Sequence, residues 1–238
     1  MCTVSYIPLK NGFILTSNRD EQPSRITIAP KSYTINNKIL YFPKDTISGG
    51  TWILTDLNKI TCCLLNGCFE KHIPNPPYRK SRGQILIDIF SYSTFEEFMD
   101  TVNLDNIEPF TLLLFDIESS SYEFRWDGQF KYVRQINTNT FHLWQSATLY
   151  EKDIQKVRFK WFENWINKHK ALDDCNIWNF HCGRHSKDTD NNIIMKRTSG
   201  IQTVSVTQVK LSSDKNEIKY LDVLNQTTHS ISLIPNHV

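Results

Sequence analysis

The feature that most constrains the fold is a long series of short strand-like segments, the first two joined by a tight-turn signal. Residues 3–7 and 13–17 are each expected to form a strand, and Asn11-Gly12 between them favours a two-residue β-hairpin loop. Further strands are expected at residues 39–42, 51–55, 59–67, 109–116, 121–126, 129–136, 201–211, 217–224 and 229–234. A chain with this many short hairpins predicts mostly antiparallel sheets.

Helical patterns occur in blocks between these strands. Residues 82–92 carry apolar side chains at helical spacing, and Thr94 with Glu97 forms a capping-box pattern at the start of a second helix. A third helix is expected at about residues 151–168, and its predicted buried stripe is Ile154, Val157, Trp161, Trp165 and Ile166. The order predicts an α+β fold in one domain over residues 1–238, with two stacked sheets and helices outside them.

Charge and hydropathy exclude several classes of protein. The chain has 27 basic and 25 acidic residues, a net charge of +2, which is too balanced to indicate a nucleic-acid partner. No segment approaches the roughly 20 apolar residues of a membrane helix, and the N-terminus lacks the pattern of a secretory signal. We therefore expect a cytoplasmic protein without an integral membrane segment. The sequence leaves its oligomeric state open.

The six cysteines are expected to be reduced thiols in such a protein. Cys175, His181, Cys182 and His185 are of the types that bind zinc, but their spacing matches no closed zinc module. The chain also lacks a P-loop, a dinucleotide-binding glycine fingerprint and a nucleophile elbow. We expect neither a metal site nor a cofactor.

A cysteine directly follows the initiator methionine. If Met1 is removed, as is usual before a small residue, Cys2 carries both a thiol and a free α-amine. That amine has a reference pKa of roughly 7.7–8.0 and can act as a general base near neutral pH. A nucleophile with its own base is the logic of N-terminal nucleophile catalysis. The alternative is that Cys2 is an ordinary small apolar residue.

The first hairpin brings this cysteine close to a polar tetrapeptide, Asn18-Arg19-Asp20-Glu21. With Asn11-Gly12 as the loop, the expected pairs are Lys10 with Phe13, Val4 with Arg19, Thr3 with Asp20, and Cys2 with Glu21. Arg19 would then favour the thiolate, and Asp20 would hold or orient the amine. The alternative is an ordinary surface ion pair of small energetic value.

Several motifs together carry a resemblance to a known family. They are Cys2, the tetrapeptide followed by Pro23 and Arg25, Gly49-Gly50-Thr51-Trp52, and Leu65-Asn66-Gly67. In this combination the chain resembles the NRDE family, also called the Transport and Golgi organisation 2 family, most densely over residues 1–83. That family is similar to the N-terminal nucleophile hydrolases of the penicillin acylase and bile salt hydrolase kind. The resemblance implies a four-layer αββα sandwich and cleavage of a non-peptide amide bond in a small molecule.

The resemblance also implies roles for individual residues. Cys2 would be the nucleophile, with Arg19 and Asp20 flanking it. Asn66 could donate to an oxyanion, a contact typically worth about 2.7–4 kcal/mol of barrier, or it is simply a turn residue. Arg197 would reach back toward the nucleophile, or it is an exposed loop residue.

One position departs from the hydrolase pattern. These hydrolases have an asparagine in the middle of the chain, whereas the comparable stretch here carries Gln145 and Ser146, of which Ser146 could bond the amine. The residues expected to bind substrate are Asn18, Glu21, Gly50, Thr51, Trp52 and Ser146.

Two functions therefore remain open. The first is an N-terminal cysteine hydrolase that cleaves an acyl-amide through an acyl-thioester and needs no cofactor. The second is a non-catalytic carrier of an apolar ligand on the same fold, because members of the family have been linked to secretory-pathway organisation and to lipid or haem handling.

Overall fold

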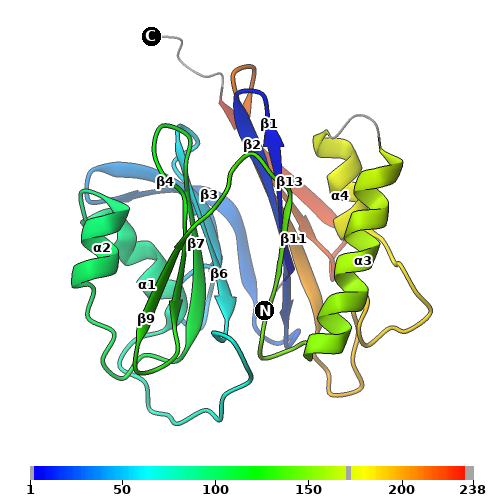
Figure 1. The fold of residues 1–238 in the computed structure, drawn as a ribbon, viewed down its shortest axis with the longest axis horizontal. Helices are drawn as coiled ribbons and strands as arrows, with labels where there is room; N and C mark the ends of the chain where they lie inside the picture. Colours follow the sequence, from blue (N-terminus) through cyan, green and yellow to red (C-terminus); the bar gives the residue numbers. More distant parts are fainter. Residues whose placement is uncertain (1–2, 170–172, 234–238) are drawn as a thin grey trace.

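A computed structural model describes residues 3–169 and 173–233 of the chain. Figure 1 shows two β-sheets stacked face to face, with α1 and α2 outside one sheet and α3 and α4 outside the other. The four layers therefore follow one another as helices, sheet, sheet, helices. This confirms the predicted αββα sandwich with antiparallel sheets.

The six-stranded sheet has the order β10-β1-β2-β11-β12-β13. Its members come from both ends and the middle of the chain, so β1 lies between a strand that follows it directly and one far along the sequence. The bounds are β1 (Thr3–Leu9), β2 (Gly12–Glu21), β10 (His142–Gln145), β11 (Gln202–Ser212), β12 (Asn216–Asp222) and β13 (Thr227–Leu233).

The seven-stranded sheet runs in chain order from β3 to β9. Its strands are β3 (Thr27–Ile35), β4 (Lys38–Asp45), β5 (Ile53–Thr55), β6 (Ile60–Asn66), β7 (Phe110–Asp116), β8 (Tyr122–Trp126) and β9 (Lys131–Gln135). The sequence patterns did not predict β3 or β10. β3 is an edge strand with Pro30 inside a register irregularity, which hides its alternation, and β10 has only four residues.

The helices are α1 (Arg82–Asp88), extended by a 3₁₀ turn (Ile89–Ser91), then α2 (Phe95–Thr101), α3 (Lys152–Lys168) and α4 (Asp174–Cys182). The cap of α2 forms as predicted, because the Thr94 hydroxyl accepts the Glu97 N–H at 3.1 Å. The Glu97 carboxylate in turn accepts the N–H of Ser93 rather than that of Thr94.

The predicted buried face of α3 is confirmed at Trp165, and Trp161 and Ile166 pack against the same apolar layer, but the prediction is wrong at Val157. The side chains buried along this helix are Arg158, Phe162 and Trp165, whereas Val157 is 45% exposed. An arginine in the middle of a helix is normally assigned to solvent, so the apolar pattern was read without it. Arg158 is buried at the position next to the exposed Val157.

Three apolar layers separate the four structural layers. One lies between α1, α2 and the seven-stranded sheet, one between the two sheets, and one beneath α3 and α4. β2 serves two of them by alternation, because Phe13 and Leu15 pack between the sheets while Ile14 packs beneath the helices. Odd-numbered residues of β2 therefore face the inner layer and even-numbered residues face the helices.

The register of the first hairpin differs from the prediction by two residues. Leu9 pairs with Gly12 and Thr3 pairs with Asn18, so the loop is Lys10-Asn11 rather than Asn11-Gly12. Gly12 has φ +134° and starts β2, where an added Cβ would lie 1.9 Å from the backbone oxygen of Leu211. The glycine is needed for this close approach to β11 and not for the loop.

A shift of two residues keeps every side chain on its predicted face. It does change the partners, since Thr3 lies opposite Asn18 rather than Asp20 and Val4 lies opposite Ser17 rather than Arg19. The predicted pairing of Cys2 with Glu21 falls outside the described residues.

Within residues 3–169 and 173–233, no helix combines the length and the apolar character needed to cross a membrane.

Candidate functional site

The polar tetrapeptide of β2 is divided between the two faces of its sheet. Arg19 and Glu21 point between the sheets, where both line a cavity. Asn18 and Asp20 point to the opposite face, where they contact residues at and near α4. The predicted cluster is therefore two separate sites joined by one strand.

The cavity on the inner side has a volume of about 300 Å³, which is at the small end of ligand pockets. Arg19 and Glu21 of β2 form one side of it, and the segment from Asp45 to Trp52 forms another. The remaining lining residues are Arg25, Leu64, Asn66, Tyr78, Lys80, Ser81, Arg82, Gly83 and Glu108. Of the predicted substrate-binding residues, Glu21, Gly50, Thr51 and Trp52 lie here, together with Arg19 and Asn66.

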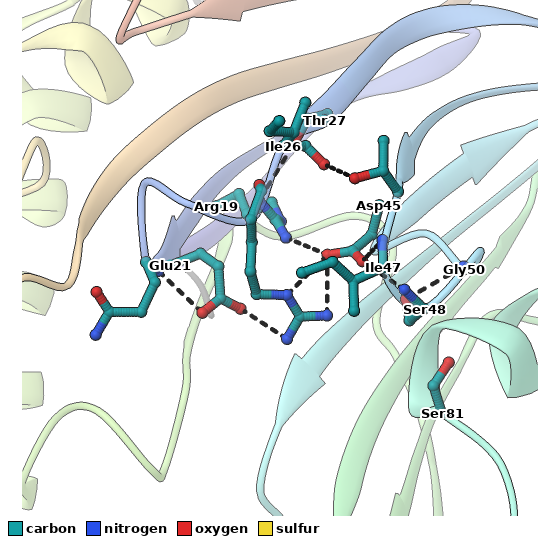
Figure 2. A network of polar contacts seen from close by, with 12 residues as sticks. Arg19, Glu21, Ile26, Thr27, Asp45, Ile47, Ser48, Gly50 and Ser81 are labelled. Atoms are coloured by element: carbon teal, nitrogen blue, oxygen red, sulfur yellow. Dashed lines mark hydrogen bonds and ion pairs between the residues drawn. The ribbon is translucent and has the colours of Figure 1, made fainter.

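Arg19 is 1% exposed and is held from several directions (Figure 2). Its Nη2 lies 2.5 Å from Oδ2 of Asp45, and its Nη1 donates to the backbone oxygen of Arg25 and to the hydroxyl of Thr27. The guanidinium carbon also lies 4.7 Å from the ring centroid of Trp52, close enough for a cation–π contact. The position of the guanidinium in the cavity wall is therefore fixed.

Asp45 is the centre of this network and was not predicted as a site residue. Its carboxylate accepts from Arg19 and Arg25, and also from the backbone N–H groups of Ile47 and Ser48, as Figure 2 shows. Burial alone would raise the pKa of Asp45, but the hydrogen bonds from Ser48 and Arg25 and the charges of Arg25 and Arg19 lower it below its ordinary value. An aspartate that accepts the N–H groups two and three residues later is typical of a turn, so this local role could be predicted from the sequence. The ion pair with Arg19 could not, because it joins segments that are distant in the chain.

Three residues of the cavity wall have polar atoms without a hydrogen-bond partner. They are the Nε of Arg19, the indole Nε1 of Trp52 and the side-chain oxygen of Asn66, all buried. Native proteins rarely leave buried polar atoms unpaired, and an unpaired atom calls for an explanation such as a catalytic role or a bound molecule. The wall of this cavity is therefore polar and under-satisfied.

Asn66 stands at the end of β6 and is tied to the other sheet. The hydroxyl of Ser146, which is fully buried, donates to the backbone oxygen of Asn66 at 2.8 Å. Ser146 follows β10 directly, so this bond links the six-stranded and the seven-stranded sheets beside the cavity. Ser146 thus holds the segment that carries Asn66 and does not itself line the cavity.

Gly50 lets two cavity segments touch through their backbones. A Cβ on Gly50 would lie 2.5 Å from the backbone carbon of Gly83 and 2.8 Å from the backbone nitrogen of Gln84, at the start of α1. Thr51 donates its N–H to the Gly83 oxygen at 3.2 Å across the same contact. No side chain fits between these segments.

We expect Gly50→Ala to lower the free energy of unfolding by about 2 kcal/mol, because the new methyl group overlaps fixed backbone atoms. Urea denaturation measures the change. Gly49→Ala is the matched control: its Cβ would meet nothing closer than 3.7 Å, so only its φ of +69° opposes the substitution, at about 1 kcal/mol. A smaller loss at Gly50 than at Gly49 would contradict the close approach.

On the outer face, Asp20 belongs to a fully buried polar network. Its two carboxylate oxygens accept the hydroxyls of Tyr150 at 2.9 Å and Thr203 at 2.7 Å. Arg197 lies on the same side, with its guanidinium carbon 5.4 Å from the Tyr150 ring centroid and Nη2 donating to the Leu149 oxygen. Asp20 and Arg197 therefore both contact Tyr150, and neither lines the cavity.

Asn18 anchors α4 to the same face. Its Nδ2 donates to the backbone oxygens of His181 and Ile193, and its Oδ1 bonds Nδ1 of His181. The other ring nitrogen of His181 lies 2.7 Å from the hydroxyl of Ser5. Both ring nitrogens of the buried His181 therefore have partners within the protein, and no group of side chains fit to hold a metal ion occurs among the described ones, which do not include that of Cys175.

Cys2 lies outside the described residues, but the strand that it precedes is placed. Thr3 lies between Asn18 of β2 and Gln145 of β10. Arg19 directly follows Asn18 in the chain, and Ser146 directly follows Gln145. Arg19 lines the cavity, and Ser146 bonds Asn66, which also lines it. The described start of β1 therefore pairs with Asn18, one residue before Arg19 of the cavity wall, although no residue of β1 itself lines the cavity.

A family model described as Transport and Golgi organisation 2 matches residues 1–231. The chain belongs to this family. A comparison with curated protein sequences finds no match.

The fold of this Transport and Golgi organisation 2 protein is similar to that of several solved structures. The chain is similar to a C2A mutant of the conjugated bile acid hydrolase from Clostridium perfringens, with a TM-score of 0.63 and 11% identity over 98% of this chain and 92% of that one. It is also similar to the Caenorhabditis elegans ortholog of N-acylethanolamine-hydrolyzing acid amidase, with a TM-score of 0.59 and 12% identity over 87% and 92%. A third similar structure is that of the penicillin V acylase from Agrobacterium tumefaciens. Its TM-score is 0.56, with 9% identity over 98% of this chain and 86% of that one. The fold is that of the N-terminal nucleophile hydrolases.

In this Transport and Golgi organisation 2 protein, a second ion pair that the sequence did not predict lies in the cavity wall. Arg82, at the start of α1, lies 2.8 Å from one oxygen of Glu108, and His72 lies 3.0 Å from the other. Arg82 and Glu108 both line the cavity. Because arginine and carboxylate side chains balance one another around the wall, the cavity favours a polar ligand over an apolar one.

Proposed function

We propose that this protein is an N-terminal cysteine hydrolase that cleaves the amide bond of a small, polar acyl-amide. The observation that carries the proposal is that Thr3, the first described residue of β1, pairs with Asn18, which directly precedes Arg19 of the polar cavity wall. The hydrolase-like fold supports it, since the similar structures include amidohydrolases. The carrier of an apolar ligand is the less favoured function, because charged side chains line this cavity.

The proposed reaction starts once Met1 has been removed. The Cys2 sulfur attacks the carbonyl carbon of the substrate, and the thiol proton passes to the α-amine of Cys2. The ammonium then returns a proton to the leaving nitrogen, which departs as an amine and leaves a thioester on Cys2. Water hydrolyses the thioester, which releases the carboxylic acid and restores the thiol.

The described residues support this reaction in distinct ways. Arg19 would stabilise the thiolate, and the side-chain Nδ2 of Asn66, a residue of the cavity wall, is proposed to donate to the developing oxyanion. Glu21, Gly50, Thr51 and Trp52 would contact the substrate as cavity residues. The residues on the outer face and at the sheet junction, which are Asn18, Asp20, Ser146 and Arg197, are proposed to position the others.

Cys62, Cys68 and Cys182 are poor nucleophiles, so a reaction at Cys2 can be distinguished from a reaction at these three thiols. Burial raises the pKa of Cys62, and it raises that of Cys68 and of Cys182 to about 11. At neutral pH these thiols stay protonated, and the thiolate is the reactive form.

The test combines intact mass with acyl transfer. We expect the purified protein to lack Met1 and to hydrolyse members of a panel of acyl-amides and acyl-thioesters of small polar acids. Cys2→Ala should abolish turnover, whereas Cys182→Ala, the matched control, should leave it unchanged. Retained Met1, or equal rates for wild type and Cys2→Ala, would rule out the hydrolase. Binding of an apolar ligand unaffected by Cys2→Ala would then favour the carrier.

A further inference from the structure

Arg158 of α3 is a buried cation that the mechanism above does not use. Its side chain is 0% exposed, and it forms no ion pair with any carboxylate among the described side chains. Placing such a charge in the interior costs free energy unless every donor finds a partner. A buried arginine without a carboxylate therefore calls for a specific reason.

The guanidinium of Arg158 joins the start of β1 to two other segments, the end of β10 and the loop after α4. Its Nε donates to Oε1 of Gln145 at 2.8 Å, and its Nη1 donates to the backbone oxygens of Asn191 and Asn192. Its Nη2 donates to the hydroxyl of Thr3, which is also fully buried. Thr3 is the first described residue of β1 and is bonded directly to Cys2.

The charged surroundings of Arg158 leave its charge largely uncompensated. The guanidinium carbon lies 4.0 Å from the ring centroid of Tyr150, and Arg197 approaches the same ring. His181 and His185 of the α4 region are close enough for the charge of Arg158 to lower the pKa of each, after burial. Among the described side chains, the carboxylate of Asp20 is linked to this site through the hydroxyl of Tyr150.

We propose that Arg158 is a positioning residue for the amino terminus: it fixes Thr3, and its charge keeps the α-amine of Cys2 unprotonated. This inference rests on the proposed function. A nearby cation disfavours the protonated amine and so lowers its pKa. Fixing the adjacent residue keeps the nucleophile in line with the cavity, where small displacements reduce rates strongly.

The test uses p-nitrophenyl acetate, which acylates nucleophilic thiols without a cognate site. The acetyl group passes to the Cys2 sulfur, the thiol proton passes to the α-amine, and p-nitrophenolate departs. The pH dependence of this single acylation reports the apparent pKa of the amine and thiol pair. Mass analysis of the N-terminal peptide identifies the acetylated residue.

Four variants separate charge from contact. Arg158→Met should move the rising limb of the pH profile upward by about one half to one unit, because the cation is lost. Arg158→Lys keeps the charge and should keep the limb. Thr3→Val keeps the charge but loses the hydroxyl, so we expect a plateau rate about tenfold lower without a shift. Thr16→Val makes the same change in β2, on the same face of the sheet, where the hydroxyl accepts a hydrogen bond from Gln208. It should change neither the plateau rate nor the position of the limb.

The outcomes distinguish the two proposals. If Cys2 of the wild type is acylated and Arg158→Met and Thr3→Val behave like Thr16→Val, the positioning role of Arg158 is overturned while the hydrolase stands. If the wild type without Met1 is not acylated at Cys2, the hydrolase itself fails and the role of Arg158 fails with it. A shifted limb in Arg158→Met that Arg158→Lys restores supports the inference, and Thr3→Val tests the contact even if Arg158→Met does not fold.

Discussion

Replacing Asp45 with asparagine is expected to lower the free energy of unfolding by about 3–5 kcal/mol, because it leaves a buried guanidinium without its carboxylate. The ion pair of Arg19 with Asp45 measures 2.5 Å, and the two side chains are 1% and 6% exposed. Asparagine can still accept hydrogen bonds from Ile47 and Ser48, so the turn is kept while the charge is lost. Urea denaturation at pH 7 measures the change.

Asp88→Asn is the matched control for this prediction. Asp88 pairs with Lys80 at a site where both side chains are about one-third exposed, with values of 33% and 32%. Exposed pairs of this kind are worth about 1 kcal/mol or less. Equal losses for Asp45→Asn and Asp88→Asn would show that Asp45 does not hold Arg19 in the cavity wall.

The Asp45 contribution also has a defined pH dependence. Its pKa in the folded protein is lowered, so its stabilisation is present above the ordinary value of roughly 3.9 and is lost as the pH falls through the lowered pKa. Asp45→Asn should therefore have its smallest effect in strong acid.

His181 is expected to make the protein less stable as the pH falls from 6.5 toward 3. Burial, followed by the charges of Arg158 and His185, lowers the pKa of His181 to about 3 in the folded state. In the unfolded chain this pKa is roughly 6.5. Between these values the unfolded state binds the additional proton, so the free energy of unfolding rises with pH. The loss between pH 6.5 and 4.5 is about 2 kcal/mol, because the unfolded histidine is already half protonated at pH 6.5.

Unfolding of wild type and His181→Gln across pH 4.5–7 measures this effect. The glutamine variant is expected to lose most of the slope, and the remainder belongs to His185, whose pKa burial also lowers. Ser5→Ala is the control, because it removes a hydrogen bond to His181 but keeps the titrating ring. A His181→Gln slope equal to that of Ser5→Ala would contradict a neutral buried histidine.

Local patterns predicted most of the fold. Alternation located the long strands, and the Thr94 cap appears where its pattern indicated, because both depend on residues near in sequence. The hairpin register was missed because Gly12 is required by β11, almost 200 positions further along the chain. The burial of Arg158 was missed for a similar reason, since its acceptors come from β1, β10 and the loop after α4.

The candidate site was predicted in part. The motif residues Arg19, Trp52 and Asn66 do share one cavity. The division of the tetrapeptide could have been predicted, because a period of two places Asn18 and Asp20 opposite Arg19 and Glu21. Asp45 could not, since only the packing of one sheet on the other brings its carboxylate to Arg19.

Because side chains alternate along β2, a change of one residue in its length reverses the direction of every side chain beyond the change. Inserting or deleting one residue between the turn and Asn18 would exchange the two faces, which carries the guanidinium under the helices and the Asp20 carboxylate between the sheets. Each group would then lose all of its described partners at once. Length changes in this segment can therefore be accommodated only in steps of two.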